Sequence, residues 1–424
     1  MTNDIPAISV IIPTHNRSTS LRRTLDALCN QTFPLQQFEV LVVADGCIDQ
    51  TVEMLKHYKT PFSLHVIKQS GQGPAIARNN GAAKAIGQLL IFLDDDIESS
   101  PFLIEAHALA HQRWPYHVVI GYLPPKLQGK VDFFSIELRT WWESMYRAMR
   151  QPGHRYTYRD LLSGNFSLEA ELFSRIGGFD PVFWCHEDYE LGVRLIKNGI
   201  PFVFVADAMG YHHEKTGLDR SLERKYQEGR SDVLLGLRHP ELRPVLPLAR
   251  FNAHFSSLSR LLYNLAFRWK AAEKAIAICL RYLLNLLEML RLRRLWRAIL
   301  DNLLGDSYWR GVAKELKTQQ SLADFIQGSL SCTNKKDLEI KIDLHEGLEL
   351  AEQQLDNKRP SSVCIYYGQQ LVGQIPSQPG VEHLRGIHLR PILATELAKP
   401  MLRALALEGA IDANLGVNRL LTVC

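Results

Sequence analysis

Three consecutive aspartates, Asp94–Asp96, stand directly after the apolar run Leu89–Leu93. Adjacent carboxylates repel one another, so a cation is their natural partner. A hard divalent ion, Mg²⁺ or Mn²⁺, prefers a small number of carboxylates together with phosphate oxygens. The alternative is structural, because acidic residues also stabilise the first turn of a helix. We favour a metal site, since the strand-like run before the aspartates brings them to the end of a strand.

Acidic residues also follow a second apolar run, Val40–Ala44. Asp45 comes first, and we expect it to accept hydrogen bonds from a ribose or a base. Asp49 stands further along the same turn, where capping of the next helix by Asp49 or Thr51 is the favoured interpretation. The two aspartates are therefore expected to differ in role, with Asp45 facing a ligand and Asp49 facing the backbone.

A third acidic group, the pair Glu187-Asp188, opens a segment with helical spacing. A carboxylate beside a hydroxyl nucleophile can remove its proton, so Asp188 is a candidate general base and Glu187 a candidate supporting residue. Leu191 and Leu195 stand at i, i+4 and are expected to anchor this helix in the core. First-turn acids also interact favourably with a helix dipole. The pair by itself favours that structural interpretation.

These acidic groups need elements that bring them together, and residues 1 to about 125 alternate strand-like and helix-like segments. Short apolar runs suit strands that are buried on both faces. The expected strands are 8–12, 40–44, 64–67 and 89–93, and the expected helices are 21–28, 51–58 and 75–86. This order indicates βαβ units and a mostly parallel sheet. Because ligands bind at the carboxyl ends of such strands, Asp45 and Asp94–Asp96 are candidate ligand contacts.

The composition is that of an ordinary globular protein. The 424 residues include 49 Lys and Arg against 45 Asp and Glu, which gives a formal charge of +4. Apolar residues make up 46% and charged residues 22%, so a disordered chain or a collagen is excluded. The near-neutral charge argues against a dedicated nucleic-acid-binding protein. Seven scattered cysteines without a Cys-x-x-Cys pair argue against zinc ribbons and disulfide frameworks, and they favour a reducing compartment.

The length predicts two or three domains. Residues 1–238 form the first, and prolines near 240–247 mark its boundary. Residues 239–330 are basic and rich in helical patterns, and residues 331–424 form a small accessory α/β domain. The elements expected in that last domain are strands at 338–342 and 363–367 and a helix near 391–407.

Six short motifs occur in one order along the chain: Ile11–Arg17, Asp45–Asp49, Ala77–Gly81, Asp94–Asp96, Gly164-Asn165 and Glu187-Asp188. Each motif alone is weak, but the ordered set is specific, and it resembles glycosyltransferase family two. The resemblance covers residues 8 to about 215, half of the chain. The family usually carries Tyr where His15 stands and Ser where Cys47 stands, and neither position is expected to carry chemistry. The resemblance implies the GT-A fold, a Rossmann-like, mostly parallel sheet flanked by helices, here with a helical extension and a small C-terminal α/β section.

The resemblance further implies a pocket for a nucleotide-diphosphate sugar. Its expected lining residues are Pro13, Thr14, Asn16, Asp45, Arg78, Asp94 and Asp95. Asp45 would contact the base or the ribose, and Arg78 the diphosphate or the sugar. Asp96 is similar to the residue that holds Mg²⁺ or Mn²⁺ in the family, and His212 stands where related enzymes often place a further metal or phosphate contact. Zinc binding by His212 and His213 together is disfavoured, because adjacent residues on a strand point to opposite faces.

The resemblance also implies an inverting reaction by single displacement. Asp188 resembles the base that takes the proton of the incoming hydroxyl, and Glu187 would orient the acceptor or support Asp188. Gly164, Asn165 and Trp184 are the expected acceptor contacts, although Trp184 suits core packing equally well. A divalent ion would stabilise the charge that develops on the departing diphosphate. The expected acceptor is a glycan or a lipid-linked hydroxyl compound.

Two alternatives to a glycosyltransferase use a similar sheet. A non-catalytic nucleotide-sugar-binding or scaffold protein need not keep both Asp94–Asp96 and Glu187-Asp188, so their joint presence argues against it. A nucleotidyltransferase would need a glycine-rich phosphate loop with a basic residue near the first strand, and Thr14–Arg17 is a poor match to such a loop. The sequence therefore predicts an enzyme that transfers a sugar.

Basic side chains are interleaved with leucines across Ala271–Leu304. Three interpretations are open: packing on the catalytic domain or a partner helix, contact with an anionic membrane surface, and nucleic-acid binding, which the scarcity of aromatic residues disfavours. We expect no nucleic-acid partner. The apolar run at 8–12 is too short for a secretory signal, and no apolar stretch reaches 18 residues. The expected location is cytoplasmic, with peripheral contact at the inner face of the membrane under the second interpretation.

Overall fold

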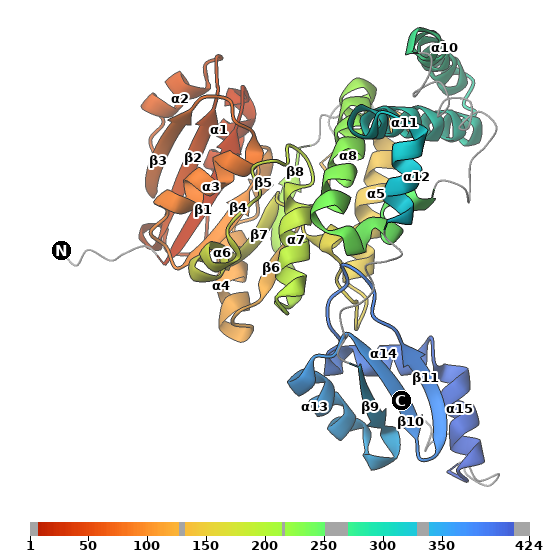
Figure 1. Ribbon diagram of the computed structural model, residues 1–424. Helices are drawn as coiled ribbons and strands as arrows, with labels where there is room; N and C mark the ends of the chain where they lie inside the picture. Colours follow the sequence, from red (N-terminus) through yellow and green to blue (C-terminus); the bar gives the residue numbers. More distant parts are fainter. Residues whose placement is uncertain (1–6, 127–131, 214–216, 251–269, 329–338, 411–424) are drawn as a thin grey trace. The chain divides into compact units, whose positions relative to one another are not determined.

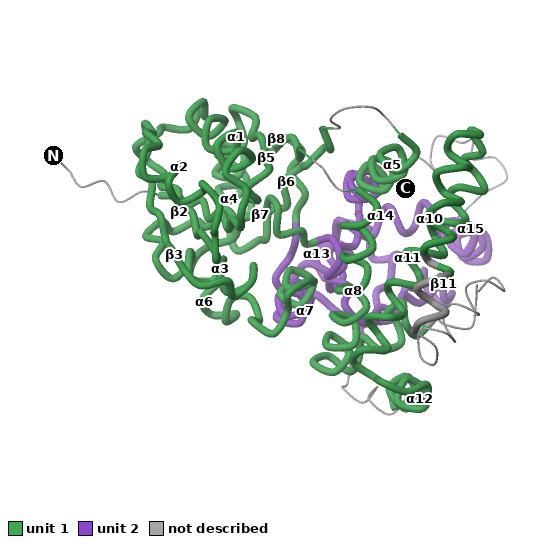
Figure 2. Tube along the Cα trace, turned by 90° about the horizontal axis from the view of Figure 1, so that it is seen from above, with its two compact units in different colours: residues 1–144, 161–191, 203–333 green, residues 145–160, 192–202, 334–424 purple. Residues whose placement is uncertain are grey.

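The computed structural model describes residues 7–126, 132–213, 217–250, 270–328 and 339–410 (Figure 1). The chain forms two compact units, which Figure 2 colours separately. Unit 1 comprises residues 1–144, 161–191 and 203–333, and unit 2 comprises residues 145–160, 192–202 and 334–424. The basic helical region therefore belongs to unit 1. The start of the expected last domain, 331–338, lies outside the described residues.

Unit 1 contains a sheet of eight strands in the order β3-β2-β1-β4-β7-β6-β8-β5. Its first four strands are β1 (Ile8–Thr14), β2 (Phe38–Asp45), β3 (Ser63–Gln69) and β4 (Leu89–Leu93). All three pairings among them are parallel. The helices between them are α1 (Ser18–Leu28), α2 (Thr51–His57) and α3 (Pro74–Lys84). The expected βαβ alternation is confirmed, and the central strands are buried on both faces, as their continuous apolar runs predicted.

The other half of the sheet contains β5 (Ile97–Ser99), β6 (Val118–Tyr122), β7 (Asn165–Glu169) and β8 (Phe202–His212). Strand β7 pairs antiparallel with both β4 and β6, and β5 pairs antiparallel with β8. The sheet is therefore parallel from β3 to β4 and mixed beyond it. Apolar runs gave no sign of this change, because the pattern of a buried strand is the same in either direction.

Helices pack closely against the parallel half. Helix α3 lies on β1 and β2, and Gly81 makes this approach possible, since an added Cβ would stand only 2.5 Å from Cγ2 of Ile11. Phe92 stacks on Phe166 with ring centroids 4.9 Å apart, which joins β4 to β7 through the core. This packing fixes α3, and with it Arg78, relative to the strand ends. The remaining helices of this part are α4 (Leu103–Arg113), α6 (Ala170–Ile176) and α7 (Glu187–Lys197), which continues into unit 2 from residue 192.

The second part of unit 1 is helical. It contains α5 (Phe133–Met149), α8 (Leu218–Arg238), α10 (Lys270–Met289), α11 (Arg293–Leu316) and α12 (Gln319–Gln327). Helices α8 and α11 cross at two glycines, because a Cβ on Gly229 or Gly311 would stand 2.0 Å from a carbonyl oxygen of the other helix. The expected helix-rich region is therefore present from residue 270 to 327. Among the described helices, none combines the length and the apolar character needed to cross a bilayer.

Unit 2 has a three-stranded sheet of its own, in the order β11-β10-β9. The strands are β9 (Glu339–Asp343), β10 (Ser362–Tyr367) and β11 (Gln370–Ile375), and the helices are α13 (Leu348–Lys358), α14 (Gly386–Ala394) and α15 (Ala398–Leu407). The two expected strands are present. The helix expected near 391–407 is instead two helices, because α14 ends at Ala394 and a new helix begins at Ala398. Segment 154–160 joins this unit through Glu382, whose buried carboxylate accepts from the backbone N–H of Tyr156 at 2.9 Å.

Short 3-10 helices complete the described chain at Leu35–Gln37, Tyr158–Asp160, Pro240–Val245, Pro247–Arg250 and Leu344–Glu346.

Candidate active site

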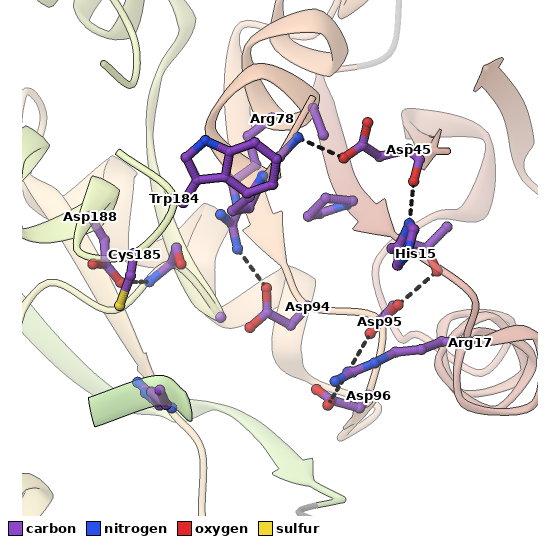
Figure 3. A pocket seen from close by; sticks show the side chains of 18 of the residues that line it. His15, Arg17, Asp45, Arg78, Asp94, Asp95, Asp96, Trp184, Cys185 and Asp188 are labelled. Carbon is purple, nitrogen blue, oxygen red and sulfur yellow. Dashed lines mark hydrogen bonds and ion pairs between the residues drawn. The ribbon is translucent and has the colours of Figure 1, made fainter. Parts of the chain in front are cut away.

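A cavity of about 850 Å³ lies in unit 1 where β1, β2 and β4 end (Figure 3). Helix α3, the loop before β7, the loop before α7 and helix α8 form most of the remaining wall, and α5 and β8 contribute one residue each. Most of the predicted site residues line it: Pro13, Thr14, Asp45, Arg78, Asp94, Asp95, Asp96, Gly164, Trp184, Asp188 and His212. Asn16, Asn165 and Glu187 are the predicted site residues that are absent from its lining.

The carboxylate of Asp45 shapes the wall at the end of β2. Oδ1 accepts hydrogen bonds at 2.8 Å from the side-chain amide of Gln69 and from the backbone N–H of Gln72. Oδ2 accepts from the backbone N–H of Gly73, also at 2.8 Å. Gly73 has a φ of +92° and precedes Pro74, the first residue of α3. These hydrogen bonds to Asp45 thus fix the conformation of the loop that leads into α3.

Asn16 serves the neighbouring turn rather than the cavity wall. Its side-chain oxygen accepts from the backbone N–H groups of Ile48 and Asp49, at 2.8 and 3.2 Å. Asp49 in turn accepts from the backbone N–H of Thr51 at 2.9 Å, just before α2, although the N-cap residue of that helix is Gln50 and not Asp49 or Thr51. Asn16 therefore does not line the expected nucleotide pocket and acts on it only indirectly, by fixing the backbone at Ile48 and Asp49.

Arg78 connects two acidic motifs that are far apart in the sequence. Its guanidinium donates to Oδ1 of Asp94 at 2.8 Å and to Oε1 of Glu187 at 2.7 Å. The Arg78 side chain is only 4% exposed, and that of Glu187 only 8%. This buried ion pair joins α3 to the start of α7, and so it fixes where Asp188, the next residue along α7, stands. Glu187 supports the site from behind the cavity wall.

The aspartates after β4 form an ordered set of contacts. Thr14 donates to Oδ2 of Asp95 at 2.7 Å, and Arg17 donates to Asp95 and Asp96 at 2.9 and 2.6 Å. Burial raises the pKa of Asp95 to about 6, although Arg17 opposes the shift. Burial acts in the same direction on Asp96, but His212 and Arg17 hold the pKa of Asp96 below its usual value. Of Asp95 and Asp96, Asp96 therefore keeps its charge more readily.

Oδ2 of Asp96 accepts from Arg17, so Oδ1, on the side of His212, is the oxygen that could bind a hard divalent ion. Nε2 of His212 lies 3.3 Å from Oδ1 of Asp96, and both residues line the cavity. His213 instead contacts Glu98, so the two adjacent histidines face opposite sides, as predicted for a strand. Within the described residues, no group of three or more His, Cys, Asp or Glu side chains gathers around one point. An ion at Asp96 would therefore depend on phosphate oxygens and water for its remaining ligands, as Mg²⁺ and Mn²⁺ commonly do.

Asp188 stands at the first turn of α7 and also lines the cavity. Its two carboxylate oxygens accept backbone N–H groups, from Ser163 at 3.0 Å and from Tyr189 at 2.9 Å. These bonds orient the carboxylate and leave further acceptor capacity on each oxygen. In Figure 3, Asp188 lies on one side of the view and Asp95, Asp96 and Arg17 on the other. Asp188, the candidate proton acceptor, and Asp96, the candidate metal ligand, therefore line one cavity.

Gly164 and Trp184 also contribute to the wall. A Cβ on Gly164 would stand 3.0 Å from Oδ2 of Asp94, so a small residue suits this position. The indole of Trp184 is 63% exposed and lies over Gly73, where an added Cβ would stand 3.3 Å from Cε3. Core packing is therefore wrong for Trp184, which offers an open aromatic face beside the cavity.

Asn165 is a correction to the predicted site. Its side chain is buried in the sheet, where Nδ2 donates to the carbonyl of Ala208 at 2.8 Å and Oδ1 contacts Nε2 of His107 at 2.9 Å. Neighbouring residues on a strand point to opposite faces, so Gly164 can border the cavity while Asn165 faces the core. The structure thus gives Asn165 a packing role in place of the expected acceptor contact.

The wall contributed by α8 escaped the sequence analysis. Four polar side chains line the cavity at spacings i, i+3, i+4 and i+7: Arg220, Glu223, Arg224 and Gln227. Such a pattern ordinarily marks a solvated helix face, which is why it gave no signal. The nearby residues Arg17, Trp142 and Cys185 were also missed. Trp142 packs edge-on against His212, with ring centroids 5.5 Å apart.

A buried chain of contacts supports the segment before Asp188. Nδ1 of His186 lies 3.1 Å from Oδ1 of Asp232 on α8, and Tyr308 on α11 donates to Oδ2 of Asp232 at 2.6 Å. His186 has a φ of +63°, a conformation that L residues adopt rarely, and its ring stacks on Tyr189. We infer that the helical part of unit 1 holds His186 in this conformation, and with it the start of α7.

This contact predicts a pH-dependent stability. Burial lowers the pKa of His186, but Asp232, with Glu228 and Asp188 nearby, raises it above its ordinary value. A raised pKa means that the folded state binds the proton more tightly, so the stabilisation is complete below about pH 6.5 and is lost as the pH rises further. We expect Asp232→Asn to reduce the free energy of unfolding by about 1–3 kcal/mol at pH 6 and by less at pH 8.5.

Urea unfolding at the two pH values measures this difference. Asp219→Asn, on the exposed part of the same helix, is the matched control. An equal loss for Asp232→Asn at pH 6 and pH 8.5 would contradict the assignment of a charged His186.

Comparisons with known proteins agree with this geometry. Residues 9–177 match the family described as glycosyl transferase family 2, and residues 143–215 match the N-terminal domain of galactosyltransferase. Validoxylamine A glucosyltransferase from Streptomyces hygroscopicus subsp. jinggangensis is 34% identical over 276 residues, which cover 58% of this chain and 64% of that protein. Chondroitin synthase from Escherichia coli is 26% identical over 253 residues, which cover 52% of this chain and 36% of the relative. The chain thus spans less than two thirds of these curated relatives.

Solved structures with a similar architecture include a mannosyltransferase, PcManGT, from Pyrobaculum calidifontis in complex with GDP-Man and Mn²⁺. It is 18% identical, with a TM-score of 0.49, and the match covers 72% of this chain and 87% of that one. Like the sheet that the resemblance implied, the eight-stranded sheet is flanked by helices, and its first four strands are parallel. Residues 9–177, whose strand ends build the cavity, match the model of glycosyl transferase family 2.

Proposed function

We propose that this protein is an inverting, metal-dependent glycosyltransferase that moves a sugar from a nucleotide-diphosphate sugar to a hydroxyl acceptor. One observation carries the proposal: Asp96 and Asp188, which come from distant parts of the chain, line the same cavity. A metal ligand and a proton acceptor in one cavity are what a displacement at a sugar carbon needs when the leaving group is a diphosphate.

Donor binding is assigned to the strand-end side of the cavity. The loop that Asp45 holds forms the wall for the base and ribose, and Arg17 and Arg78 supply positive charge beside the aspartates. Asp96 and His212 would hold Mg²⁺ or Mn²⁺, with phosphate oxygens of the donor completing the ligand set. When bound, such an ion stabilises the negative charge that grows on the departing diphosphate.

The acceptor reaction is assigned to Asp188. The acceptor oxygen attacks the anomeric carbon as the bond from that carbon to the phosphate oxygen breaks, and the electron pair of that bond leaves with the diphosphate. The hydroxyl proton passes to the carboxylate of Asp188. The backbone N–H groups of Ser163 and Tyr189 hold this carboxylate in place. Neither group transfers its proton to the carboxylate, so Asp188 can still take the proton of the acceptor hydroxyl. Attack from the face opposite the leaving group inverts the anomeric configuration.

Acceptor recognition is assigned to Trp184 and to the α8 wall. An exposed indole face binds the apolar face of a sugar ring by stacking. Arg220, Glu223 and Gln227 line the same cavity and offer donors and acceptors for hydroxyl groups. These features support a glycan acceptor or a lipid-linked one that carries a sugar. Catalysis is proposed for residues 1–238, with 239–330 and 331–424 as accessory regions.

A reducing, cytoplasmic location is part of the proposal. The five described cysteines are all free, which agrees with a compartment that keeps thiols reduced.

Nucleotide binding in the presence and absence of metal tests the donor site. We expect UDP or GDP to bind measurably with Mn²⁺ and at least about 10-fold more weakly in EDTA, because the ion would link Asp96 to the diphosphate. Asp96→Asn is expected to remove this dependence on Mn²⁺. Isothermal titration calorimetry measures both, and Glu98→Gln, an acid two positions away that contacts His213 and Lys126, is the matched control. Binding of every nucleoside diphosphate with equal strength in EDTA and in Mn²⁺ would contradict the metal site.

A further inference from the structure

Helices α10 and α11 expose an unusual number of large apolar side chains. Seven of them are between 44% and 73% exposed: Ile278, Tyr282, Leu286, Met289, Leu290, Leu292 and Leu295. On α10, Tyr282, Leu286 and Met289 follow the i, i+4, i+7 spacing of one helix face. We call the seven side chains the α10–α11 apolar surface. Large apolar side chains exposed along one helix face often mark a site of interaction.

The opposite face of α10 is already used for packing. Leu280, Leu284 and Leu287 are buried in a core that also contains Trp296 and Leu300 of α11. Helix α10 is therefore apolar on two sides, and one side is enough to hold it against its neighbours. Packing within the protein explains the inner side only, so the outer side needs another explanation.

Arginines are the main charged residues beside the apolar surface, although Arg281 pairs with Asp219 and both Arg293 and Arg297 pair with Glu137. Between residues 278 and 297 the sequence contains five arginines and a single acidic residue, Glu288. The carboxylate of Glu288 is turned toward the protein, where it accepts from the backbone N–H of Phe133 at 3.0 Å. Arg291 and Arg294 are exposed at and just after the turn between the two helices. Their charge lies next to Leu290, Leu292 and Leu295.

The α10–α11 surface has a defined place in unit 1. Figure 1 shows α10 next to α11, and α11 packs on α8 through the glycine contacts described above. Helix α8 also lines the cavity. The apolar and basic surface is thus separated from the acceptor wall of the cavity by one pair of packed helices.

We propose that the α10–α11 surface binds an anionic lipid membrane. Apolar side chains on such a helix enter the boundary between headgroups and acyl chains, while arginines contact lipid phosphates and keep their charge in the polar layer. A second copy of this chain fits less well, since a two-fold interface would place the same positive charges against each other. A nucleic acid bound through the arginines would leave the exposed leucines of the α10–α11 surface in contact with water. The proposal is independent of the reaction assigned above, although a lipid-linked acceptor would lie at the same membrane.

Vesicle flotation tests the proposal with the full chain. We expect flotation with vesicles of phosphatidylcholine containing phosphatidylglycerol, and little with phosphatidylcholine alone. Arg291→Glu/Arg294→Glu is expected to weaken binding at least about 10-fold, because each arginine near an anionic surface contributes severalfold. Lys84→Glu/Arg175→Glu makes the same charge change on exposed residues elsewhere in unit 1 and is expected to leave binding unchanged.

A second variant separates the apolar contribution from the charge. Tyr282→Ser/Leu286→Ser is expected to reduce binding to anionic vesicles, whereas Leu109→Ser, at an exposed position on α4, is expected not to. The proposal is overturned if the natural protein fails to float with anionic vesicles at low salt, or if both α10–α11 variants bind as well as the natural protein. A concentration-dependent dimer that these variants abolish would overturn it in favour of self-association.

Discussion

Replacing Asp188 with Asn is expected to lower the rate of sugar transfer by about 10²–10⁴-fold while the affinity for the nucleotide sugar changes little. The amide keeps the size of the side chain but cannot take a proton from the acceptor hydroxyl. Asp188 does not touch the aspartates after β4, since its carboxylate accepts from Ser163 and Tyr189. The substitution should therefore lower the rate of sugar transfer without changing the affinity for the donor. Release of the nucleoside diphosphate, measured with and without acceptor, gives the rate.

Glu190→Gln provides the matched control. Glu190 belongs to the same first turn of α7 but is buried against His239, at 3.1 Å, and does not line the cavity. A purely structural role for the first-turn acids would make the two substitutions act alike. A catalytic role predicts a large effect on transfer for Asp188→Asn alone. Equal transfer by the natural protein and Asp188→Asn would contradict the assignment of the base, and donor binding without any transfer would favour the non-catalytic alternative.

The parallel half of the fold was predictable because its determinants are local. Each buried strand is a short apolar run, and each run ends at a polar residue that topology must place at one edge of the sheet. Asp45 and Asp94–Asp96 could be assigned to one site on this basis alone. The same logic fails for the second half, where the direction of β7 depends on where the long connection after β6 returns to the sheet.

Other parts of the site depend on tertiary contacts that leave little trace in the sequence. Arg78 looks like any helical arginine until α7 brings Glu187 within 2.7 Å. Asn165 follows a glycine that borders the cavity, but the alternation of the strand turns its side chain to His107. The polar face of α8 carries no mark that distinguishes a cavity wall from a solvated surface. Residue types and their spacing predicted which residues at the strand ends line the cavity. They did not predict that α8 forms the opposite part of its wall.

Arg78→Met is expected to lower the free energy of unfolding by about 3–5 kcal/mol, because it leaves the buried carboxylate of Glu187 without its counter-charge. Methionine retains much of the aliphatic volume, so the loss reports on charge more than on packing. Arg17→Met is the matched control. Arg17 also bridges two carboxylates, but its side chain is 27% exposed against 4% for Arg78, and solvent screens exposed pairs more strongly. Urea unfolding at pH 7 measures both losses.

The double variant Arg78→Met/Glu187→Gln identifies the origin of the loss. If the stranded charge of Glu187 destabilises Arg78→Met, the second substitution should recover at least about 1 kcal/mol, since a neutral amide is far less costly to bury than a carboxylate. Simple addition of the two losses would contradict the buried ion pair as the link between α3 and α7. Recovery of stability without recovery of transfer is the expected outcome, because Arg78 also orients Asp94 beside the proposed diphosphate site. Arg78 would then have two roles: it stabilises the fold through Glu187, and it arranges the charges in the cavity through Asp94.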